Sequence, residues 1–458
     1  MHVTIVGTGY VGLTTGVCLA SLGHAVRCVD VVPERIDAIN RGEPPFHEPK
    51  LESLLREAIA GRRLSATADL DEAVLGSEAT FITVGTPRTA HGIDLSYVEK
   101  AARQIGSALR RQPRYHVVVV KSTVVPGTTA SFVKAILEEA SGRRAGEFGL
   151  CMNPEFLREG SAVDDFMHPD RIVIGQWDDR SGAVLDELYR SFACPKVVTT
   201  PSNAEMIKYA SNALLATLIS FSNEMAKLCE ATSGTDVEKV LGAVHLDRRL
   251  SPLVGARVVS PDILSYLRAG CGFGGSCLPK DVEALRAYAR QQGLAPHLLD
   301  AVLAVNDERP GQLVAFTREA VGALSGATVA VLGLAFKAGT DDLRDSPALG
   351  IIDGLLKEQA SVKAYDPVVR GPTHALVDPR AVLCRTPEEA VRGADAALVV
   401  TAWPEFAKLQ WGALCRTMRR PVVVDGRNAL GHLTWPPHIV YVPIGRMPQP
   451  GNPQAQPG

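Results

Sequence analysis

The sequence lacks a strong excess of charge of one sign, a Cys-X-X-Cys pair and an apolar run long enough to cross a membrane. Lysine and arginine number 48 against 50 aspartates and glutamates, which gives a formal net charge of -2. This balance provides no broad positive surface for nucleic acid or for an anionic membrane. We therefore expect neither as a partner, and an anionic ligand has to be held by a local group of residues.

The nine cysteines are scattered and lack the Cys/His spacing of a metal site, so we expect no metal. An odd, dispersed set of cysteines is typical of a reducing compartment. The most membrane-like stretch, 209–223, is shorter than the roughly 20 residues that span a bilayer and is flanked by charged residues. The N-terminus begins directly with a strand-like segment instead of a secretion signal. We expect a cytoplasmic protein without a membrane segment.

Hydrophobic residues make up 46% of the 458 residues, which suits a folded chain with several cores. Short β-branched runs alternate with helical patterns in the first half and again near the C-terminus, which predicts parallel sheets covered by helices. The predicted strands are 3–6, 25–30, 79–84, 117–121, 149–152, 171–175, 196–199, 328–332, 361–365, 396–401 and 422–425. Residues 202–231 carry apolar side chains at helical spacing and predict a long helix between the two α/β parts.

A glycine-rich turn, GTGYVG at 7–12, follows the first predicted strand and opens a helix. In such a turn the first glycine permits the bend, the second lets the backbone approach a diphosphate and the third allows close helix–strand packing. The helix N-terminus then offers N–H donors to the phosphates. Asp30 ends the second predicted strand 18 residues after Gly12. An acid there can bind the adenosine ribose hydroxyls, so the pattern predicts a dinucleotide site and favours NAD.

Two further residues bear on this cofactor site. Arg35 leaves NADP open, because a nearby arginine can meet a 2′-phosphate. Thr86, in VGTP at 84–87, lies where a later strand of the sheet ends and is expected near the cofactor. Alone, a GxGxxG motif could be an ordinary glycine-rich turn, but the preceding strand, the following helix and the acid favour the dinucleotide site.

The segment GFGGSCLPKD at 272–281 combines glycines with a cysteine, a proline and an aspartate. Pro279 suits the first turn of a helix. Cys277 would then stand at a helix N-terminus, where a thiolate is stabilised and reactive. Asp281 follows one helical turn later and could position a water or accept a proton beside the sulfur. The other cysteines, including Cys271, are more simply interpreted as core thiols.

Two other groups fit acid–base chemistry. Glu205, Lys208 and Asn212 share one face of the long predicted helix, so the lysine and the amide could donate jointly to a developing oxyanion. The alternative is a solvated helix face. Glu155 and Glu159, in NPEFLREG at 153–160, would face the same way if this segment were helical. They could serve in proton transfer and water positioning, or they could be structural.

A dinucleotide site combined with an activated cysteine indicates oxidation of an alcohol to an acid. Hydride transfer from an alcohol needs no covalent step, but onward oxidation of the aldehyde does, because thiolate addition gives a thiohemiacetal that can deliver a second hydride. The resulting thioester is then hydrolysed, so two NAD are consumed per turnover. Two alternatives stay open: a dehydrogenase that stops after one oxidation, and a catalytically inactive sensor of NAD or a sugar nucleotide.

The sequence resembles the UDP-glucose/GDP-mannose dehydrogenase family over nearly its full length, to about residue 445. The matching motifs follow one another in the family's order. They are GTGYVG at 7–12, INRGEPPFHEP at 39–49, VGTP at 84–87, KSTVVPGT at 121–128, NPEFLREGSA at 153–162, HPDRIVIG at 168–175, EMIKYASN at 205–212, GFGGSCLPKD at 272–281, GLAFKAGTDDLRDSP at 333–347 and DGRN at 425–428.

The resemblance implies a role for each matching residue. Cys277 is expected to be the nucleophile, Lys208 and Asn212 to stabilise the oxyanion, and Asp281 to act through an ordered water. Thr123 and Glu159 would position water and transfer protons, with Glu155 in the same group. The expected cofactor residues are Gly7, Gly9, Tyr10, Val11, Gly12, Asp30, Arg35, Thr86, Thr123, Glu159 and Arg344. The expected substrate residues are Glu155, Phe156, Leu157, Arg158, Glu159, Lys208, Asn212, Tyr266, Arg268, Gly272, Phe273, Gly274, Lys337 and Arg427.

The resemblance also implies the architecture and the reaction. We expect an α/β protein in which two Rossmann-like, doubly wound parallel-sheet domains are joined by a long central helix. The expected parts are an NAD-binding domain at 1–201, a central helical domain at 202–310 that carries the Cys277 loop and forms a homodimer, a UDP-sugar-binding domain at 311–445 and a disordered tail at 446–458. The expected reaction is NAD-dependent oxidation of UDP-glucose at C6 to UDP-glucuronate.

GDP-mannose or another nucleotide sugar is the alternative substrate. Leu278, where relatives often carry phenylalanine, and Cys271 are the two departures from the family's pattern. They bear on the choice of substrate and leave the mechanism unchanged.

Overall fold

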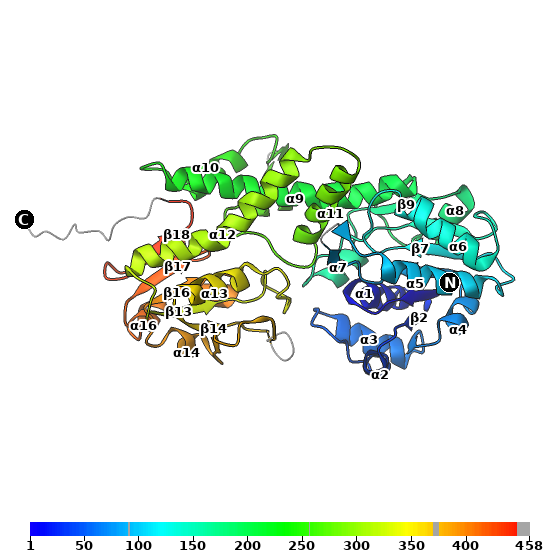
Figure 1. The fold of residues 1–458 in the computed structure, drawn as a ribbon, viewed down its shortest axis with the longest axis horizontal. Helices are drawn as coiled ribbons and strands as arrows, with labels where there is room; N and C mark the ends of the chain where they lie inside the picture. The colour runs from blue at the N-terminus through cyan, green and yellow to red at the C-terminus, as the bar shows by residue number, and fades with distance from the viewer. Residues whose placement is uncertain (90–91, 256, 370–374, 447–458) are drawn as a thin grey trace, which may run out of the picture. The chain divides into compact units, whose positions relative to one another are not determined.

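The computed structural model describes residues 1–89, 92–255, 257–369 and 375–446 (Figure 1). The chain divides into two compact units, of which the first is Met1–Ser211 with Ala287–Gln292 and the second is the remainder. The 30-residue helix α9 (Pro201–Glu230) begins in the first unit and ends in the second, as expected for a central connecting helix.

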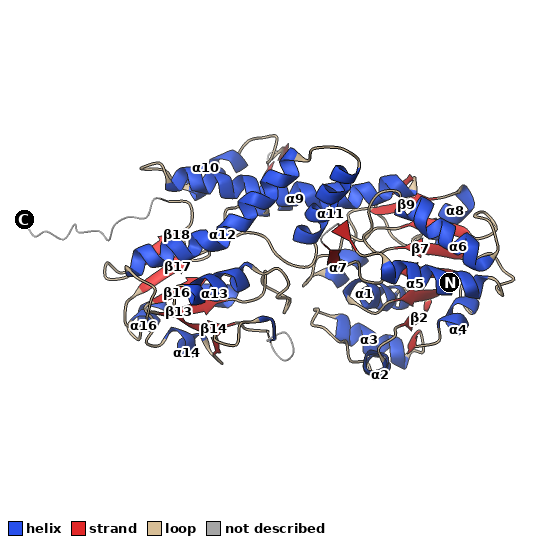
Figure 2. Ribbon diagram, viewed as in Figure 1, coloured by secondary structure: helices blue, strands red, loops and turns tan. Residues whose placement is uncertain are grey.

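The first unit is built on an eight-stranded sheet with the order β10-β9-β8-β7-β4-β1-β2-β3 (Figure 2). Its strands are β1 (His2–Val6), β2 (Ala25–Val29), β3 (Leu64–Thr67), β4 (Ala79–Ile82), β7 (Val117–Val120), β8 (Gly149–Met152), β9 (Ile172–Gln176) and β10 (Lys196–Thr199). Because β1 lies between β2 and β4, the strand order reverses there. Ligands of such sheets bind outside the carboxyl ends of the strands at this point.

Helices cover both faces of this sheet. They are α1 (Tyr10–Ser21), α2 (Pro33–Asn40), α3 (Leu51–Ala60), α4 (Leu70–Leu75), α5 (Ser96–Leu109), the π-helix η1 (Thr128–Val133), α6 (Lys134–Ser141), α7 (Ala162–Met167) and α8 (Asp179–Leu188), with a small hairpin of β5 (Arg88–Thr89) and β6 (Gly92–Ile93). The four valines of β7 illustrate the layers: Val117 and Val119 enter one core, and Val118 and Val120 enter the other. A strand buried on both faces reads as a continuous apolar run.

The predicted parallel sheet has one exception, because β8 and β9 are antiparallel. The chain leaves β8 through the loop at 153–161 and the six-residue helix α7. These segments do not carry it back across the sheet, so β9 starts at the end where β8 finishes. The other paired strands of this sheet are parallel.

The second unit contains a six-stranded parallel sheet with the order β15-β14-β13-β16-β17-β18. Its strands are β13 (Thr328–Leu332), β14 (Ser361–Tyr365), β15 (Val382–Leu383), β16 (Ala396–Val399), β17 (Val422–Asp425) and β18 (Val440–Pro443). The order again reverses beside its first strand, β13. The prediction of two doubly wound α/β sheets joined by a long helix is therefore confirmed.

The remaining elements precede this sheet or cover it. They are α10 (Val237–His245), a hairpin of β11 (Leu253–Val254) and β12 (Arg257–Val258), the 3-10 helix η2 (Asp262–Ser265), α11 (Leu278–Gln291), α12 (His297–Val321), α13 (Pro347–Lys357), α14 (Pro387–Val391), α15 (Pro404–Lys408) and α16 (Trp411–Cys415). Arg446, the first residue of the predicted tail, forms an ion pair with Asp236 at 2.8 Å. The rest of that tail, 447–458, lies outside the described residues.

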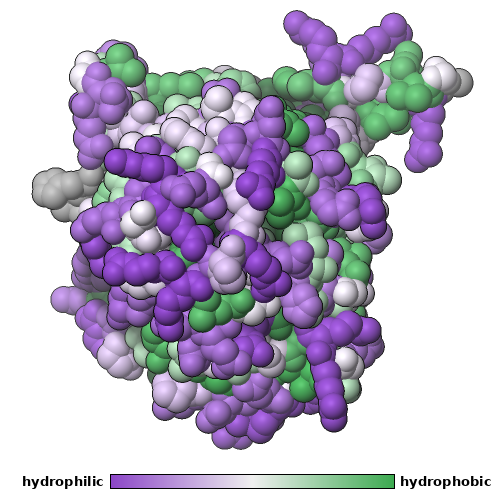
Figure 3. Space-filling model, turned by 90° about the vertical axis from the view of Figure 1, so that its right-hand side faces the viewer, coloured by the Kyte–Doolittle hydropathy of each residue, from purple (hydrophilic) through white to green (hydrophobic). Residues whose placement is uncertain are grey.

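The surface is largely polar on the face that Figure 3 shows. Hydrophilic side chains predominate there, and apolar areas are scattered between them. Within the described ranges, no helix combines the length and the apolar composition needed to span a bilayer.

Candidate active site

The turn at residues 7–12 has the backbone geometry that a diphosphate requires. Gly7 has a φ of +97°, in the left-handed region that favours glycine. A Cβ on Gly12 would lie 1.9 Å from the Gly7 carbonyl oxygen, whereas a Cβ on Gly9 would meet nothing within 4 Å. The helix α1 begins at Tyr10, and Gly9 at its N-cap has no side chain to accept from the first N–H groups. These N–H groups fit the diphosphate of a dinucleotide.

Asp30 directly follows β2 and is held by the same turn. Its carboxylate accepts hydrogen bonds from the Thr8 N–H at 2.8 Å, from the Thr8 hydroxyl and from the Val31 N–H at 2.8 Å. Burial alone raises the pKa of Asp30, but the hydrogen bonds from Thr8 and from the Val32 N–H, together with Arg35, outweigh burial and leave the pKa below its ordinary value. Arg35 lies 3.7 Å from this carboxylate. An ionised acceptor here fits the adenosine ribose of NAD.

Two predicted cofactor residues follow the neighbouring strands β4 and β7. The Thr86 hydroxyl donates to the Thr123 carbonyl oxygen at 2.9 Å. The Ser122 hydroxyl donates to the Val84 carbonyl oxygen at 2.6 Å. The VGTP and KSTVVPGT segments are thus joined at the carboxyl edge of the sheet, and Val11 lies half-buried in the first turn of α1.

A buried group of two lysines and one glutamate lies in the first unit. Lys208, on α9, places Nζ 2.7 Å from Oε1 of Glu155. Lys121 donates to Oδ1 of Asn153 at 2.9 Å, and burial lowers its pKa to about 8. Burial alone raises the pKa of Glu155, but the charge and hydrogen bond of Lys208, the Leu157 N–H and the charge of Lys121 together outweigh burial and leave this pKa below its ordinary value. Glu155 is therefore an ionised carboxylate that fixes the Lys208 ammonium.

The segment 153–160 is a loop, so the helical alignment of Glu155 and Glu159 is not realised. The Glu155 carboxylate accepts the Leu157 N–H at 2.7 Å, a local hydrogen bond that competes with helix formation. Glu155 then contacts Lys208, whereas Glu159 lies near Tyr10. Burial, then Glu48 and then Glu159 raise the pKa of the Tyr10 hydroxyl.

The three side chains between these glutamates make structural contacts. Phe156 packs under the Arg171 guanidinium, with 4.0 Å between the guanidinium carbon and the ring centroid. Leu157 packs against a core of the first sheet. Arg158 forms two-pronged hydrogen bonds to Asp165, the shortest at 2.6 Å.

Cys277 directly precedes α11, so its predicted position at a helix N-terminus is confirmed. The Cys277 thiol is half-buried. One turn later, the buried Asp281 accepts from the Asn212 amide at 2.6 Å through Oδ2 and pairs with Lys280 at 2.6 Å through Oδ1. Cys277, Asn212 and Asp281 thus all belong to the second unit, where Asn212 is bonded to Asp281. Lys208 and Glu155 pair in the first unit.

The glycine loop before Cys277 is fixed against the C-terminal sheet of the same unit. Arg427 donates to the Gly272 carbonyl oxygen at 2.9 Å and to the Val400 carbonyl oxygen at 2.8 Å. A Cβ on Gly274 would lie 2.2 Å from the Asp345 carbonyl oxygen, so the close approach requires glycine. Phe273 is buried, and its N–H donates to the Asn306 amide oxygen at 2.7 Å.

The other predicted residues of the second unit lie on its surface or close to it. Lys337 places Nζ 5.7 Å from the centroid of the Phe336 ring. Arg344 pairs with Asp342 at 2.7 Å, and its carbonyl oxygen accepts the Gly275 N–H at 2.9 Å. Tyr266 is half-buried and Arg268 is exposed.

Several residues that the sequence did not single out hold these groups in place. Arg309, which is 1% exposed, donates to the Gly270 carbonyl oxygen at 3.0 Å, and Asn223 accepts the Gly270 N–H at 2.8 Å. Lys121 and Glu48 are buried in the first unit. Lys121 and Glu48 lie inside long motifs shared with the family, at 121–128 and 39–49, and this position is a signal that they matter. The spacing of those motifs does not reveal which groups the two side chains contact.

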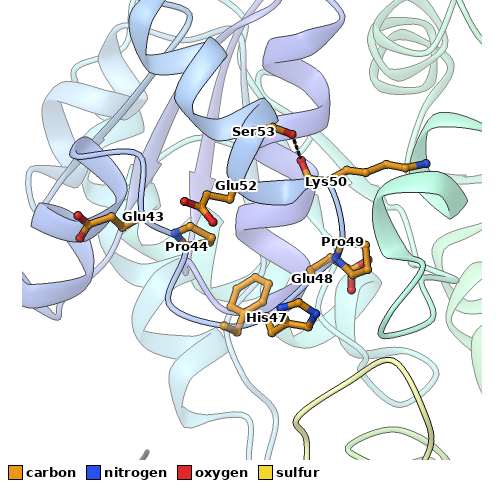
Figure 4. A pocket seen from close by; sticks show the side chains of 9 residues that line it. Glu43, Pro44, His47, Glu48, Pro49, Lys50, Glu52 and Ser53 are labelled. Carbon is orange, nitrogen blue, oxygen red and sulfur yellow. Dashed lines mark hydrogen bonds between the residues drawn. The ribbon is translucent and has the colours of Figure 1, made fainter. Parts of the chain in front are cut away.

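A pocket of about 480 Å³ lies in the first unit and is lined by residues from Glu43 to Ser53 (Figure 4). The residues that line it include none of the predicted site residues. Among the described residues, no group of three or more histidines, cysteines, aspartates and glutamates could hold a metal ion.

Comparisons with known proteins agree with this geometry. The UDP-glucose/GDP-mannose dehydrogenase family matches through three domain models: the NAD binding domain at residues 1–193, the central domain at 202–308 and the UDP binding domain at 330–432. UDP-glucose 6-dehydrogenase AglM of Haloferax volcanii is 45% identical over 443 residues, which cover 93% of this chain and 97% of the relative. A UDP-glucose 6-dehydrogenase of Pseudomonas aeruginosa is 42% identical, with 93% of each chain covered.

Solved structures give the same result. A UDP-glucose dehydrogenase from Pyrobaculum islandicum is 39% identical and matches with a TM-score of 0.87 over 97% of both chains. A GDP-mannose dehydrogenase from Pseudomonas aeruginosa is 35% identical, with a TM-score of 0.54 over 97% of this chain and 99% of the other. The chain is therefore an NAD-binding oxidoreductase that belongs to the UDP-glucose/GDP-mannose dehydrogenase family.

Proposed function

We propose that the protein oxidises UDP-glucose at C6 to UDP-glucuronate, with two NAD per turnover and a covalent intermediate on Cys277. The observation that carries the proposal is the position of Cys277 at the N-terminus of α11, one turn before an Asp281 that Asn212 holds. Several relatives that are 37–45% identical are named UDP-glucose 6-dehydrogenases, and this supports UDP-glucose as the substrate.

The first oxidation converts the C6 alcohol to an aldehyde. The alcohol loses its hydroxyl proton and a hydride from C6. NAD, when bound at the glycine turn, accepts the hydride in each of the two oxidations. In this proposal Thr123 and Glu159 position the water that carries the proton away. Gly7, Gly9, Gly12 and Asp30 bind and orient the cofactor.

In the second stage the Cys277 thiolate adds to the aldehyde carbon and forms a thiohemiacetal. The carbonyl oxygen becomes an oxyanion, which donors placed in advance stabilise most effectively. We assign these donors to the Lys208 ammonium and to the second N–H of the Asn212 amide, whose first N–H is bonded to Asp281. Glu155 keeps the ammonium in place by its 2.7 Å ion pair.

Loss of the second hydride converts the thiohemiacetal to a thioester, which water hydrolyses to the acid and the free thiol. Asp281 is the group that we assign to this water, with Glu159 as a proton acceptor. Asp281 is 1% exposed, and its donors Asn212 and Lys280 fix its orientation.

The UDP part of the substrate is assigned to the second unit. Residues 330–432 match a UDP binding domain, and Lys337 and Arg427 lie within that range. Arg427 also holds the loop at Gly272, so one guanidinium could orient both the loop and a diphosphate. Tyr266, Arg268, Phe273 and Gly274 complete the proposed sugar-nucleotide contacts.

Pairing of two copies and a cytoplasmic location are part of the proposal. Exposed apolar side chains recur about every two turns along α9, which supports pairing through this helix. They are Met206, Leu214, Phe221 and Leu228. None of the nine cysteines, all of which lie in described residues, forms a disulfide, which fits a reducing compartment. Light scattering of wild type and Phe221→Lys tests the pairing, and a wild-type monomer would contradict it.

The proposed reaction is tested by the NADH formed per sugar nucleotide consumed, with UDP-glucose, GDP-mannose and UDP-N-acetylglucosamine in parallel. Two NADH per UDP-glucose, with little reaction of the other two, is the expected result. Two per GDP-mannose would keep the mechanism and overturn the substrate. One NADH with release of free aldehyde would overturn the role of Cys277.

A further inference from the structure

Glu48 is a buried carboxylate with no assigned role. It lies on the chain between α2 and α3, among the residues of the pocket in Figure 4, and is 5% exposed. A buried carboxylate is costly unless its oxygens accept hydrogen bonds. Its donors come from two segments that are far apart in the sequence and that both belong to the proposed site.

The first segment is the diphosphate turn, and the second is the loop that carries Glu159 together with Ala162, the first residue of α7. Oε1 of Glu48 accepts the Ala162 N–H at 2.8 Å, and Oε2 accepts the Gly160 N–H at 2.7 Å. Oε2 also accepts the Tyr10 hydroxyl. The Gly160 N–H lies 3.1 Å from the Tyr10 oxygen as well, so the three groups form one network.

Neighbours of Glu48 hold the same two segments. The Phe46 and Tyr10 rings pack with centroids 4.9 Å apart. Lys50 pairs with Asp164 of α7 at 2.6 Å. The chain from Phe46 to Lys50 therefore contacts α1 on one side and the segment after Glu159 on the other.

We infer that Glu48 is a positioning residue that couples NAD binding to the placement of Glu159. The inference rests on the proposed function, in which Glu159 positions water and transfers protons. Tyr10 directly follows Gly9 of the diphosphate turn, and Gly160 directly follows Glu159. Because the Glu48 carboxylate binds both the Tyr10 hydroxyl and the Gly160 N–H, a displacement of the turn changes the hydrogen bonds that hold the backbone next to Glu159, and the reverse is also true.

The test uses Glu48→Gln, which keeps the side-chain volume but replaces one acceptor oxygen by an N–H donor facing a backbone N–H. NAD binding is measured by calorimetry without a sugar nucleotide, and we expect the Kd to rise about tenfold. At saturating NAD we also expect kcat to fall by about the same factor, because Glu159 loses its support. Glu52→Gln is the matched control, since Glu52 lines the same pocket, is exposed and pairs with Arg56.

Tyr10→Phe removes only the hydroxyl of the network. If Glu48 acts through Tyr10, the double variant weakens NAD binding by less than the product of the two single effects. Independent, multiplicative effects would overturn the coupling. If Glu48→Gln fails to fold, Tyr10→Phe tests the coupling by itself. An unchanged NAD Kd in Tyr10→Phe would then overturn the inference.

A purely structural Glu48 gives a different result: a lower Tm in Glu48→Gln, with the NAD Kd and kcat of the folded protein at wild-type values. That outcome would overturn the inference. NAD binding is measured without the sugar nucleotide, so it tests the role of Glu48 separately from the reaction. A wild-type protein that fails to oxidise UDP-glucose would contradict the proposed function, but the effect of Glu48→Gln on the NAD Kd could still be measured.

Discussion

The Nζ of Lys208 lies 2.7 Å from Oε1 of Glu155, and the two residues are only 3% and 6% exposed. This ion pair joins α9 to the loop that follows β8. A buried pair of this kind holds a charged group in one place, but each partner becomes costly when the other is removed. The pair therefore makes the position of the proposed oxyanion donor depend on Glu155.

Removal of either partner is expected to destabilise the protein strongly. Lys208→Met and Glu155→Gln should each lower the free energy of unfolding by about 3–5 kcal/mol, because the remaining group is left buried with one partner fewer. The double variant should lose less than the sum, as denaturant unfolding of the four proteins would show.

The same variants separate stability from catalysis. Lys208→Met should lower kcat by about a hundredfold to a thousandfold, the usual effect of removing one oxyanion donor. Glu155→Gln should lower kcat less, because the ammonium is retained. A Glu155→Gln protein with a larger loss of kcat than Lys208→Met would contradict the roles assigned to the two residues.

Cys277→Ser tests the covalent step. A serine hydroxyl is a weak nucleophile without an adjacent base, so formation of UDP-glucuronate should fall on the order of a thousandfold or more. Oxidation of the alcohol does not need the thiol, so aldehyde should still form. Quantifying acid, aldehyde and NADH together distinguishes the two oxidations. Cys384→Ser, a half-buried thiol in the second unit, is the control and should behave as wild type.

Two glycines of the diphosphate turn are expected to respond differently to alanine. Gly12→Ala places a methyl group 1.9 Å from the Gly7 carbonyl oxygen, so the free protein should lose about 1–3 kcal/mol of stability. Gly9→Ala meets no protein atom within 4 Å, so its stability should stay within about 0.5 kcal/mol of wild type. Its methyl group would instead stand where the diphosphate approaches the backbone, and NAD binding should weaken.

Denaturant unfolding without NAD and NAD titration together check this pair of variants. If Gly9→Ala and Gly12→Ala lower the free energy of unfolding equally, the open space beside Gly9 does not distinguish it from Gly12. Unchanged NAD affinity in Gly9→Ala would place the diphosphate elsewhere.

Much of the fold could be predicted from local pattern. Each predicted strand is present with ends within two residues, because β-branched runs between turn residues are a local signal. Strand β3 carries the mixed sequence LSAT, and β15 has two residues, so neither offers such a run. The antiparallel β8–β9 pair depends on the path of the intervening chain and has no local pattern.

The site was predicted in part for the same reason. The four-residue spacing of Cys277 and Asp281 predicts that they lie one helical turn apart. The spacing of the glycines at 7–12 predicts the turn between a strand and a helix. Glu205 shows the limit: it shares a helix face with Lys208, yet its carboxylate accepts the Gly127 and Thr129 N–H groups at 2.6 Å and 2.7 Å. Contacts of this kind join segments about 80 residues apart, and a single sequence does not encode them in its spacing.

Lys121 should make stability depend on pH in the alkaline range. Burial lowers the pKa of Lys121 from 10.5 to about 8. Below pH 8 both the folded and the unfolded chain carry the charge, so the cost of burying it, about 3 kcal/mol, is fully present. Between pH 8 and 10.5 the unfolded chain binds more protons, so the free energy of unfolding should rise with pH.

Denaturant unfolding of wild type and Lys121→Met between pH 7 and 11 measures this effect. Groups other than Lys121 titrate in both proteins, so the difference between the two free energies isolates the lysine. Relative to Lys121→Met, wild type should gain up to about 3 kcal/mol across the window. Lys100→Met, which replaces an exposed lysine of α5, should show no such difference from wild type. A difference between wild type and Lys121→Met that stays constant with pH would mean that Lys121 keeps an ordinary pKa, and that the charge of Glu155 compensates for its burial.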